Sequence, residues 1–193
     1  MSQALLQLVV SKFGDDVVFT HAQHGDETAV LKPSAWFKVH QFLRDDPGAA
    51  MNMLTDLTAV DFIDREPRFE IVSHLCSLTL GHRIRLKTSV GDEDGDDADV
   101  DTLTALWASA NWLEREAYDM MGIVFLGHPD LRRILLYPEF EGYPLRKDYP
   151  ADKIQPLVPF RETGENEKLA PFDRHEGMSF GRQTHQVSNQ DSE

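Results

Sequence analysis

The chain has 193 residues, of which 41% are hydrophobic, so most of it should fold around a core of its own. Its formal net charge of −14 repels phosphate backbones, which excludes nucleic acid as an expected partner. No apolar run approaches the ~20 residues that a membrane-spanning helix needs, so any attachment to a membrane should come through partners.

The N-terminal part predicts two helices with two short strands between them. Apolar residues recur at helical spacing over residues 4–13, which predicts the first helix. Strand-forming residues then fill 17–23 and 28–32, on either side of a turn signal. Proline suits the first turn of a helix, and Pro33 precedes a helical pattern over residues 34–44.

Three further strands are expected at 54–63, 68–80 and 82–90. The last of them alternates cationic with apolar side chains, which is typical of an antiparallel strand with one face in water. This order of helices and strands predicts an α+β fold, a two-layer sandwich of a mixed or antiparallel sheet with helices. We assign residues 1–125 to this domain.

Two consecutive helices are predicted at 101–108 and 111–121. Asn111 is a good N-cap for the second helix, and Glu114 three positions later can complete a capping box. Gly122 is placed to end that helix in the left-handed conformation.

One face of the second helix carries Trp112, Arg115, Glu116 and Asp119. Its spacing allows an ion pair between Arg115 and Asp119, and the plainer interpretation is a face exposed to water. The large ring of Trp112 has no evident reason to face water, so the face is also a candidate contact surface.

Residues 126–193 differ from the rest of the chain in composition. They hold seven of the ten prolines, which excludes long helices and central strands. Apolar and aromatic residues between 134 and 149 are nevertheless too frequent for a free tail. We therefore expect an extended Pro-rich segment that lies partly on its own domain and mostly on a partner. Residues from about Asp152 onward should become ordered only in the complex.

The acidic stretch at 91–99 resembles a calcium loop only in part. Asp92, Asp94 and Asp96 alternate like the first ligands of such a loop. Asp97 and Leu103 then occupy the positions where the loop needs Gly and Glu. A surface loop in water is the interpretation that this pattern favours.

Other residues that could carry chemistry also have plainer interpretations. His21 and His24 lie three apart in a predicted strand and would face opposite sides of the sheet, so they make a poor metal site. His128 precedes a proline without an evident nucleophile, which is typical of a turn residue. The one cysteine, Cys76, excludes an intrachain disulfide and a thiolate cluster, and fits the reducing cytoplasm.

A dense pattern runs through residues 111–150. It consists of NWLERE at 111–116, Asp119, GI at 122–123, GHPDLRRIL at 127–135 and FEGYPLRKDYP at 140–150. In these residues and their spacing the chain resembles the thirty-kilodalton subunit family of respiratory complex I, whose bacterial members are the C subunits of NADH-quinone oxidoreductase. It departs from the family pattern at Tyr143, where His is common, so no imidazole role is carried over to that position.

The resemblance implies a non-catalytic, cofactor-free structural subunit in the hydrophilic arm of proton-translocating NADH:quinone oxidoreductase. Its implied partners are the forty-nine-kilodalton subunit, which helps to form the quinone site, and neighbouring iron–sulfur subunits. FMN, iron–sulfur clusters, NADH and quinone would belong to other subunits of the complex. The implied location is peripheral, on the cytoplasmic side of the bacterial inner membrane. The alternative is the equivalent subunit of a membrane-bound nickel–iron hydrogenase or of another quinone-type dehydrogenase.

No catalytic, cofactor-binding or metal-binding residue is assigned, but the same region gives candidate interface residues. They are Trp112, Arg115, Glu116, Asp119, His128, Asp130, Arg132, Arg133, Arg146, Lys147, Asp148 and Tyr149. Arginine binds carboxylates in a fixed bidentate geometry, so the two basic pairs at 132–133 and 146–147 are expected to dock on a partner.

This docking hypothesis makes a prediction about two arginines. Alanine at Arg133 or Arg146 should lower the amount of assembled complex and leave the melting temperature of the isolated domain nearly unchanged. Glu116 and Asp119 are expected to be the nearest acidic counterparts of the basic pairs, or further contacts with the partner.

Overall fold

The computed structural model describes residues 3–92 and 98–156, which belong to one compact unit. Residues 1–2, 93–97 and 157–193 are outside the description. The central aspartates of the calcium-like stretch and most of the tail expected to order in the complex therefore lie outside the described residues.

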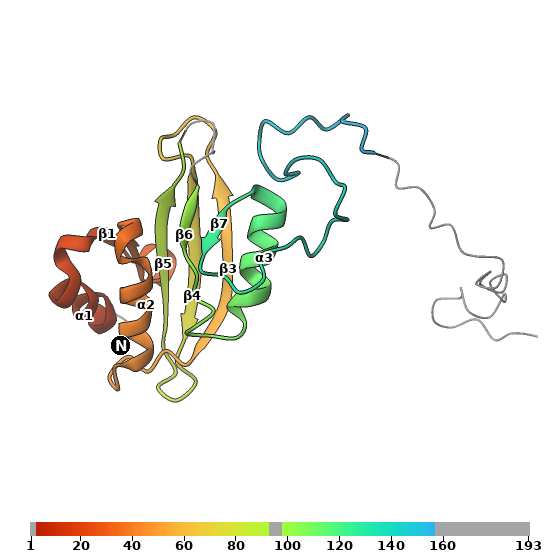
Figure 1. The fold of residues 1–193 in the computed structure, drawn as a ribbon. Helices are drawn as coiled ribbons and strands as arrows, with labels where there is room; N and C mark the ends of the chain where they lie inside the picture. Colours follow the sequence, from red (N-terminus) through yellow and green to blue (C-terminus); the bar gives the residue numbers. More distant parts are fainter. Residues whose placement is uncertain (1–2, 93–97, 157–193) are drawn as a thin grey trace, which may run out of the picture. The chain divides into compact units, whose positions relative to one another are not determined.

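A five-stranded mixed sheet forms the centre of this unit (Figure 1). In spatial order its strands are β1 Val17–His21, β2 Thr28–Leu31, β5 Arg83–Val90, β4 Phe69–Cys76 and β3 Met53–Asp61. β2 and β5 pair in parallel because the chain crosses over through a helix and the β3–β4 hairpin before it returns as β5. The other neighbouring strands are antiparallel, so the predicted α+β class with a mixed sheet is confirmed.

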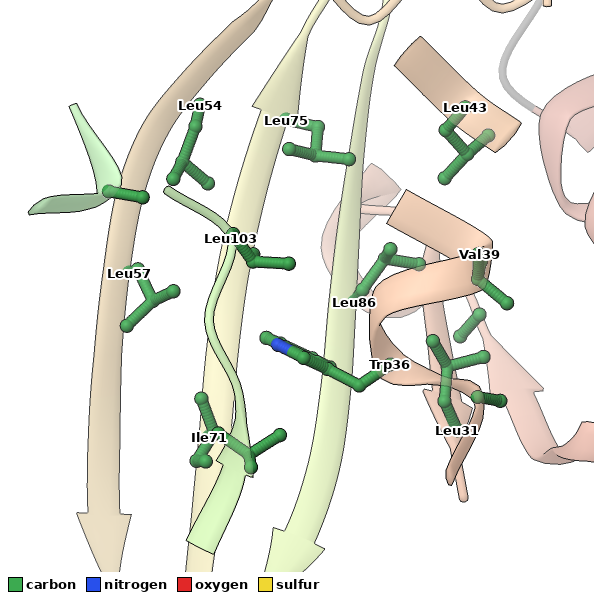
Figure 2. Close-up of a cluster of buried hydrophobic side chains, with 14 of the residues drawn as sticks. Leu31, Trp36, Val39, Leu43, Leu54, Leu57, Ile71, Leu75, Leu86 and Leu103 are labelled. Carbon is green, nitrogen blue, oxygen red and sulfur yellow. The ribbon is translucent and has the colours of Figure 1, made fainter. Parts of the chain in front are cut away.

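Within the described residues three α-helices accompany the sheet: α1 Gln3–Phe13, α2 Trp36–Asp45 and α3 Ala110–Met121. Short 3-10 turns at Gly14–Asp16, Gln23–Gly25 and Pro33–Ala35 precede β1, β2 and α2. α2 contributes Trp36, Val39 and Leu43 to the same buried cluster as Leu31 and Leu86 of the sheet (Figure 2). Burial of each side chain of this size contributes about 1.5–3 kcal/mol to stability.

The side chains of β5 alternate between the buried core and the solvent-facing side of the sheet. In β5 the apolar side chains Ile84, Leu86 and Val90 are buried, whereas Arg85 and Lys87 between them are half-buried. The alternation predicted for this strand is confirmed, but its pairing is antiparallel only with β4 and is parallel with β2.

A second, two-stranded parallel sheet pairs β6 Asp99–Asp101 with β7 Val124–Leu126. The helix predicted at 101–108 is wrong, because the chain leaves β6 through turns. These turns bury Leu103 and Trp107 in the main core, so tertiary packing overrides the helical pattern here.

The predicted capping box of α3 is also wrong. The helix begins at Ala110, and the preceding Ser109 donates its hydroxyl to the Leu54 carbonyl oxygen of β3 at 3.1 Å. Glu114 does not reach back to Asn111 but accepts hydrogen bonds from Thr102 Oγ1 at 2.5 Å and from the Leu103 N–H at 2.7 Å. Tertiary contacts with the turns before the helix replace the local cap.

Candidate functional site

The end of α3 is shaped by Gly122. Its backbone takes the left-handed conformation, with φ of 80°, which confirms the prediction from sequence. The position needs glycine for a second reason, because a Cβ there would lie 2.5 Å from Tyr143 Cε2 and 2.7 Å from Arg146 Nη2. The chain after α3 therefore returns to the end of this helix and touches its backbone.

Asp119 of α3 is fully buried and holds the returning chain. Its Oδ2 accepts hydrogen bonds from three successive backbone N–H groups, those of Ile134, Leu135 and Leu136, at 3.0, 2.8 and 2.9 Å. Its Oδ1 accepts a fourth from Arg133 Nη1 at 2.8 Å. A single carboxylate thus fixes four consecutive residues that have no regular secondary structure. We call residues 131–149 the anchored segment.

Two arginines complete this contact. Arg115 of α3 donates to the carbonyl oxygens of Arg132 and Arg133, at 3.1 and 3.2 Å. Arg133 also donates to the Gly142 carbonyl oxygen at 3.1 Å, and its guanidinium lies 5.4 Å from the Tyr143 ring. The helix therefore offers matched partners to both the N–H and the C=O groups of the anchored segment.

A second ion cluster fixes the far end of the anchored segment. Arg68 and Asp61 are buried and form a bidentate pair with two distances of 2.8 Å. Arg68 Nη2 also donates to Asp148 at 2.6 Å, and the Lys147 N–H donates to Asp61 Oδ2 at 2.7 Å. Residues 147–148 are thereby tied to the ends of β3 and β4.

Arg146 lies between the two clusters. Its Nε donates to the Met121 carbonyl oxygen at 2.7 Å, which satisfies one of the free carbonyls at the end of α3. Its guanidinium lies 4.7 Å from the Tyr143 ring and 5.3 Å from the Phe69 ring. This half-buried side chain therefore packs against the chain's own residues.

The charges of both clusters are held in their ionised forms. Hydrogen bonds from Arg68 lower the pKa of Asp61 and of Asp148. Burial alone would raise the pKa of Asp119, but its three backbone N–H donors and Arg133 outweigh that effect and lower it. The carboxylates therefore act as fixed anions and not as proton donors or acceptors near neutral pH.

Other residues near α3 point outward. The Trp112 side chain is 60% exposed, with the Arg115 guanidinium 5.1 Å from its ring, and Glu116 is exposed beside it. Asp130 and Arg132 form an exposed ion pair of 3.0 Å, which contributes little to stability. Lys147 is exposed as well.

His128 and Tyr149 act within the chain. His128 Nδ1 accepts from the Asp130 N–H at 3.0 Å, which leaves Nε2 to donate to the Asn111 carbonyl oxygen at 3.2 Å. The interpretation of His128 as a turn residue is confirmed by these contacts. Tyr149 stacks on Phe140 and is hydrogen-bonded to Gln155.

The sheet domain and the anchored segment together match one protein family. The family described as "Respiratory-chain NADH dehydrogenase, 30 Kd subunit" matches residues 29–155, which is more than half of the chain. The chain belongs to this family.

Sequence relatives of this family member cover most of its length. It is 41% identical over 153 residues to a C subunit (number 2) of the NADH-quinone oxidoreductase of Rhizobium etli (strain CIAT 652), covering 77% of the chain and 80% of the relative. It is 44% identical over 146 residues to the C subunit of Roseiflexus sp. (strain RS-1), covering 76% and 82%. For the C subunit of Rhodobacter capsulatus the identity is 38% over 184 residues, covering 90% of each chain.

A solved structure shares the fold of this family member. It is "Structure of the membrane-bound sulfane sulfur reductase (MBS), an archaeal respiratory membrane complex", with a TM-score of 0.64. One of its chains is 22% identical, and the match covers 77% of this chain and 85% of that chain. At this identity the likeness shows the fold alone.

The geometry divides the candidate interface residues of the family member into two groups. Seven of them make their main side-chain contacts within the chain: Arg115, Asp119, His128, Arg133, Arg146, Asp148 and Tyr149. The expected pairing of an arginine from 132–133 with Asp119 is present, but the expected pair of Arg115 with Asp119 is replaced by bonds to backbone carbonyls. The internal role of Arg133 and Arg146 leads us to expect that their loss lowers the melting temperature, contrary to the sequence-based prediction.

Sequence reasoning missed Arg68 and Asp61. Arg68 stands at a strand start after a turn, and no local pattern marks it as buried. Asp61 could have been found, because Leu57 and Ala59 place the inward positions of β3 two apart and Asp61 is the next one. An acid at an inward position needs a buried cation as its partner.

The described part of the chain shows no group of three or more His, Cys, Asp or Glu side chains that could hold a metal ion. Within the same residues no helix has the length and apolar character to cross a membrane.

Among the described residues, Glu114 is the acid whose pKa rises toward neutrality. The side chain is fully buried, and this burial raises its pKa to about 7, although the bonds from Thr102 and Leu103 work in the opposite direction. An acid whose folded pKa exceeds its unfolded value holds its proton more tightly in the folded state. Its ionisation therefore reduces stability as pH rises from about 4.5 to about 7, by up to ~3 kcal/mol.

We expect Glu114→Gln to remove this penalty. An amide keeps an acceptor for the Leu103 N–H and carries no charge. In urea unfolding of the full chain, the free energy of unfolding of the variant relative to wild type should increase as pH rises. The difference should be largest at about pH 8. The comparison must be made at each pH, because buried His40, with a pKa lowered to about 4, contributes the opposite slope in an overlapping range. Glu139→Gln, at an exposed position, is the matched control.

Proposed function

We propose that the chain is a non-catalytic, cofactor-free structural subunit in the hydrophilic arm of a proton-translocating NADH:quinone oxidoreductase. The family match at 29–155 carries the proposal, because it spans both the sheet and the anchored segment. The relatives named as C subunits of this oxidoreductase, at 38–44% identity, support the same assembly.

The proposed partners are the forty-nine-kilodalton quinone-site subunit and neighbouring iron–sulfur subunits. The exposed side chains of α3, Trp112 and Glu116, support a contact surface on this helix. The internal bonds of Asp119 and Arg133 hold that surface in one conformation. FMN, iron–sulfur clusters, NADH and quinone then belong to other subunits.

The proposed location is peripheral, on the cytoplasmic side of the bacterial inner membrane, through the complex. A second assembly of the same general kind remains an alternative to this proposal. That alternative is the equivalent subunit of a nickel–iron hydrogenase or of another quinone-type dehydrogenase. The identity of the co-purifying subunits separates the two: NADH- and flavin-binding subunits for the first, hydrogenase subunits for the second.

The experiment is purification of the tagged full chain from its native membrane. We expect the quinone-site subunit and iron–sulfur subunits to co-purify in stoichiometric amounts. The chain purified alone should show no flavin, haem or iron–sulfur absorbance and should oxidise no NADH. A chromophore that stays with the lone chain through gel filtration would contradict the cofactor-free part of the proposal.

A further inference from the structure

A small groove lies between β3 and the C-terminal half of α3. Its volume is about 180 Å³, and its apolar lining includes Leu57, Ala117 and Met120. Leu145 of the anchored segment, 51% exposed, also lines it. Asp56 of β3 and Glu116 of α3 add two carboxylates to the lining.

These two carboxylates differ from the other acids near α3. Asp61 and Asp119 are buried and bound to arginine and backbone N–H groups. Asp56 and Glu116 are exposed, and neither accepts a hydrogen bond nor forms an ion pair within the described residues. The groove therefore offers two carboxylates that form no direct hydrogen bond or ion pair with the described residues.

The size and chemistry of the groove define its occupant. Sites for cofactors and metabolites usually measure about 300–1,000 Å³, so this groove is better suited to a single side chain. A lysine or arginine side chain has an aliphatic stem that packs on apolar surface and a cationic head that binds carboxylates. The apolar lining with Met120 and Leu145 fits the stem, and Asp56 and Glu116 fit the head.

The groove adjoins the outward face of α3. Glu116 lies four residues after Trp112, so the two side chains are neighbours on the helix surface. Trp112 is the most exposed aromatic side chain of this helix, and aromatic residues are enriched where proteins bind one another. We propose that a neighbouring subunit of the assembly inserts a lysine or arginine side chain into this groove, where Asp56 and Glu116 bind its cation. This inference rests on the proposed function and names the chemistry of the partner at that surface.

The test compares two double variants in the assembled complex. Asp56→Asn with Glu116→Gln removes both charges and keeps the shape of the groove. Asp99→Asn with Glu139→Gln removes two exposed charges elsewhere. We expect the first variant to leave the purified complex about tenfold faster than wild type at low salt, where charge pairs are least screened, and the second at the wild-type rate. Both should melt like wild type as isolated chains, because none of the four acids is buried or paired in the described structure.

A photo-crosslinking side chain at Leu145 identifies the occupant. In the intact complex we expect a cross-linked peptide from a neighbouring subunit, with a lysine or arginine at or beside the modified position. Cross-links confined to this chain's own residues, or an equal release rate for both double variants, would overturn the inference and leave the proposed function standing. If the wild-type chain does not co-purify with any subunit, the proposed function itself fails and this inference with it.

Discussion

Replacing Asp119 with alanine should lower the free energy of unfolding of the full chain by about 3–5 kcal/mol. The substitution leaves three backbone N–H groups and the Arg133 guanidinium without their acceptor in a buried place. Urea titration of the purified chain measures the loss. The matched control is Asp130→Ala, because Asp130 is exposed and forms only a surface pair, so its loss should change stability by less than about 1 kcal/mol.

The same substitution should change the response to acid. The pKa of Asp119 is lowered in the folded chain, so its contribution is present above its unfolded value near ~4 and is lost as pH falls further. The variant lacks this contribution and should therefore lose less stability than wild type between about pH 4 and pH 2. Equal losses in the Asp119 and Asp130 variants would show that this carboxylate does not hold the anchored segment.

Replacing Arg68 with alanine should have an effect of similar size, about 3–5 kcal/mol. The substitution leaves the fully buried Asp61 carboxylate without its cation and releases Asp148. Thermal and urea unfolding of the full chain measure the loss, and Arg83→Ala, at an exposed arginine of β5, is the control.

A second change tests the mechanism of this loss. Arg68→Met combined with Asp61→Asn removes both charges of the buried pair, so no uncompensated ion remains. The double variant should be clearly more stable than Arg68→Ala. If both are equally unstable, the role of Arg68 is packing and not neutralisation of Asp61.

Much of the sheet domain could be predicted from periodicity, because each of its elements is amphipathic. The strands near 17–31 and 53–90 and the helices α1 and α2 follow the expected ranges within a few residues. Gly122 could be predicted because the end of a helix has a local chemical signature. The prediction of an N-cap at Asn111 failed, because hydrogen bonds of Glu114 and Ser109 to residues distant in sequence replace a local cap.

The anchored segment could be predicted only in part. Its composition correctly excluded helices and central strands, yet nothing local tells which helix receives it. The bonds from Asp119 to the 134–136 backbone join residues at least 15 positions apart and involve backbone groups, which no side-chain pattern reports. For the same reason Arg115 and Asp119 of α3 were interpreted as wet or partner-facing, although the chain itself covers these two side chains.

The three backbone N–H groups bound to Asp119 also affect the entropy lost when the chain binds a partner. Fixing one backbone residue opposes association by about 1–2 kcal/mol when it happens at the moment of binding. Residues 133–136 are already fixed before any partner binds, so their backbone entropy is lost during folding and not during association. A change at Asp119, which touches no outer surface, should therefore weaken binding of a neighbouring subunit by making the segment that it contacts disordered in the free chain.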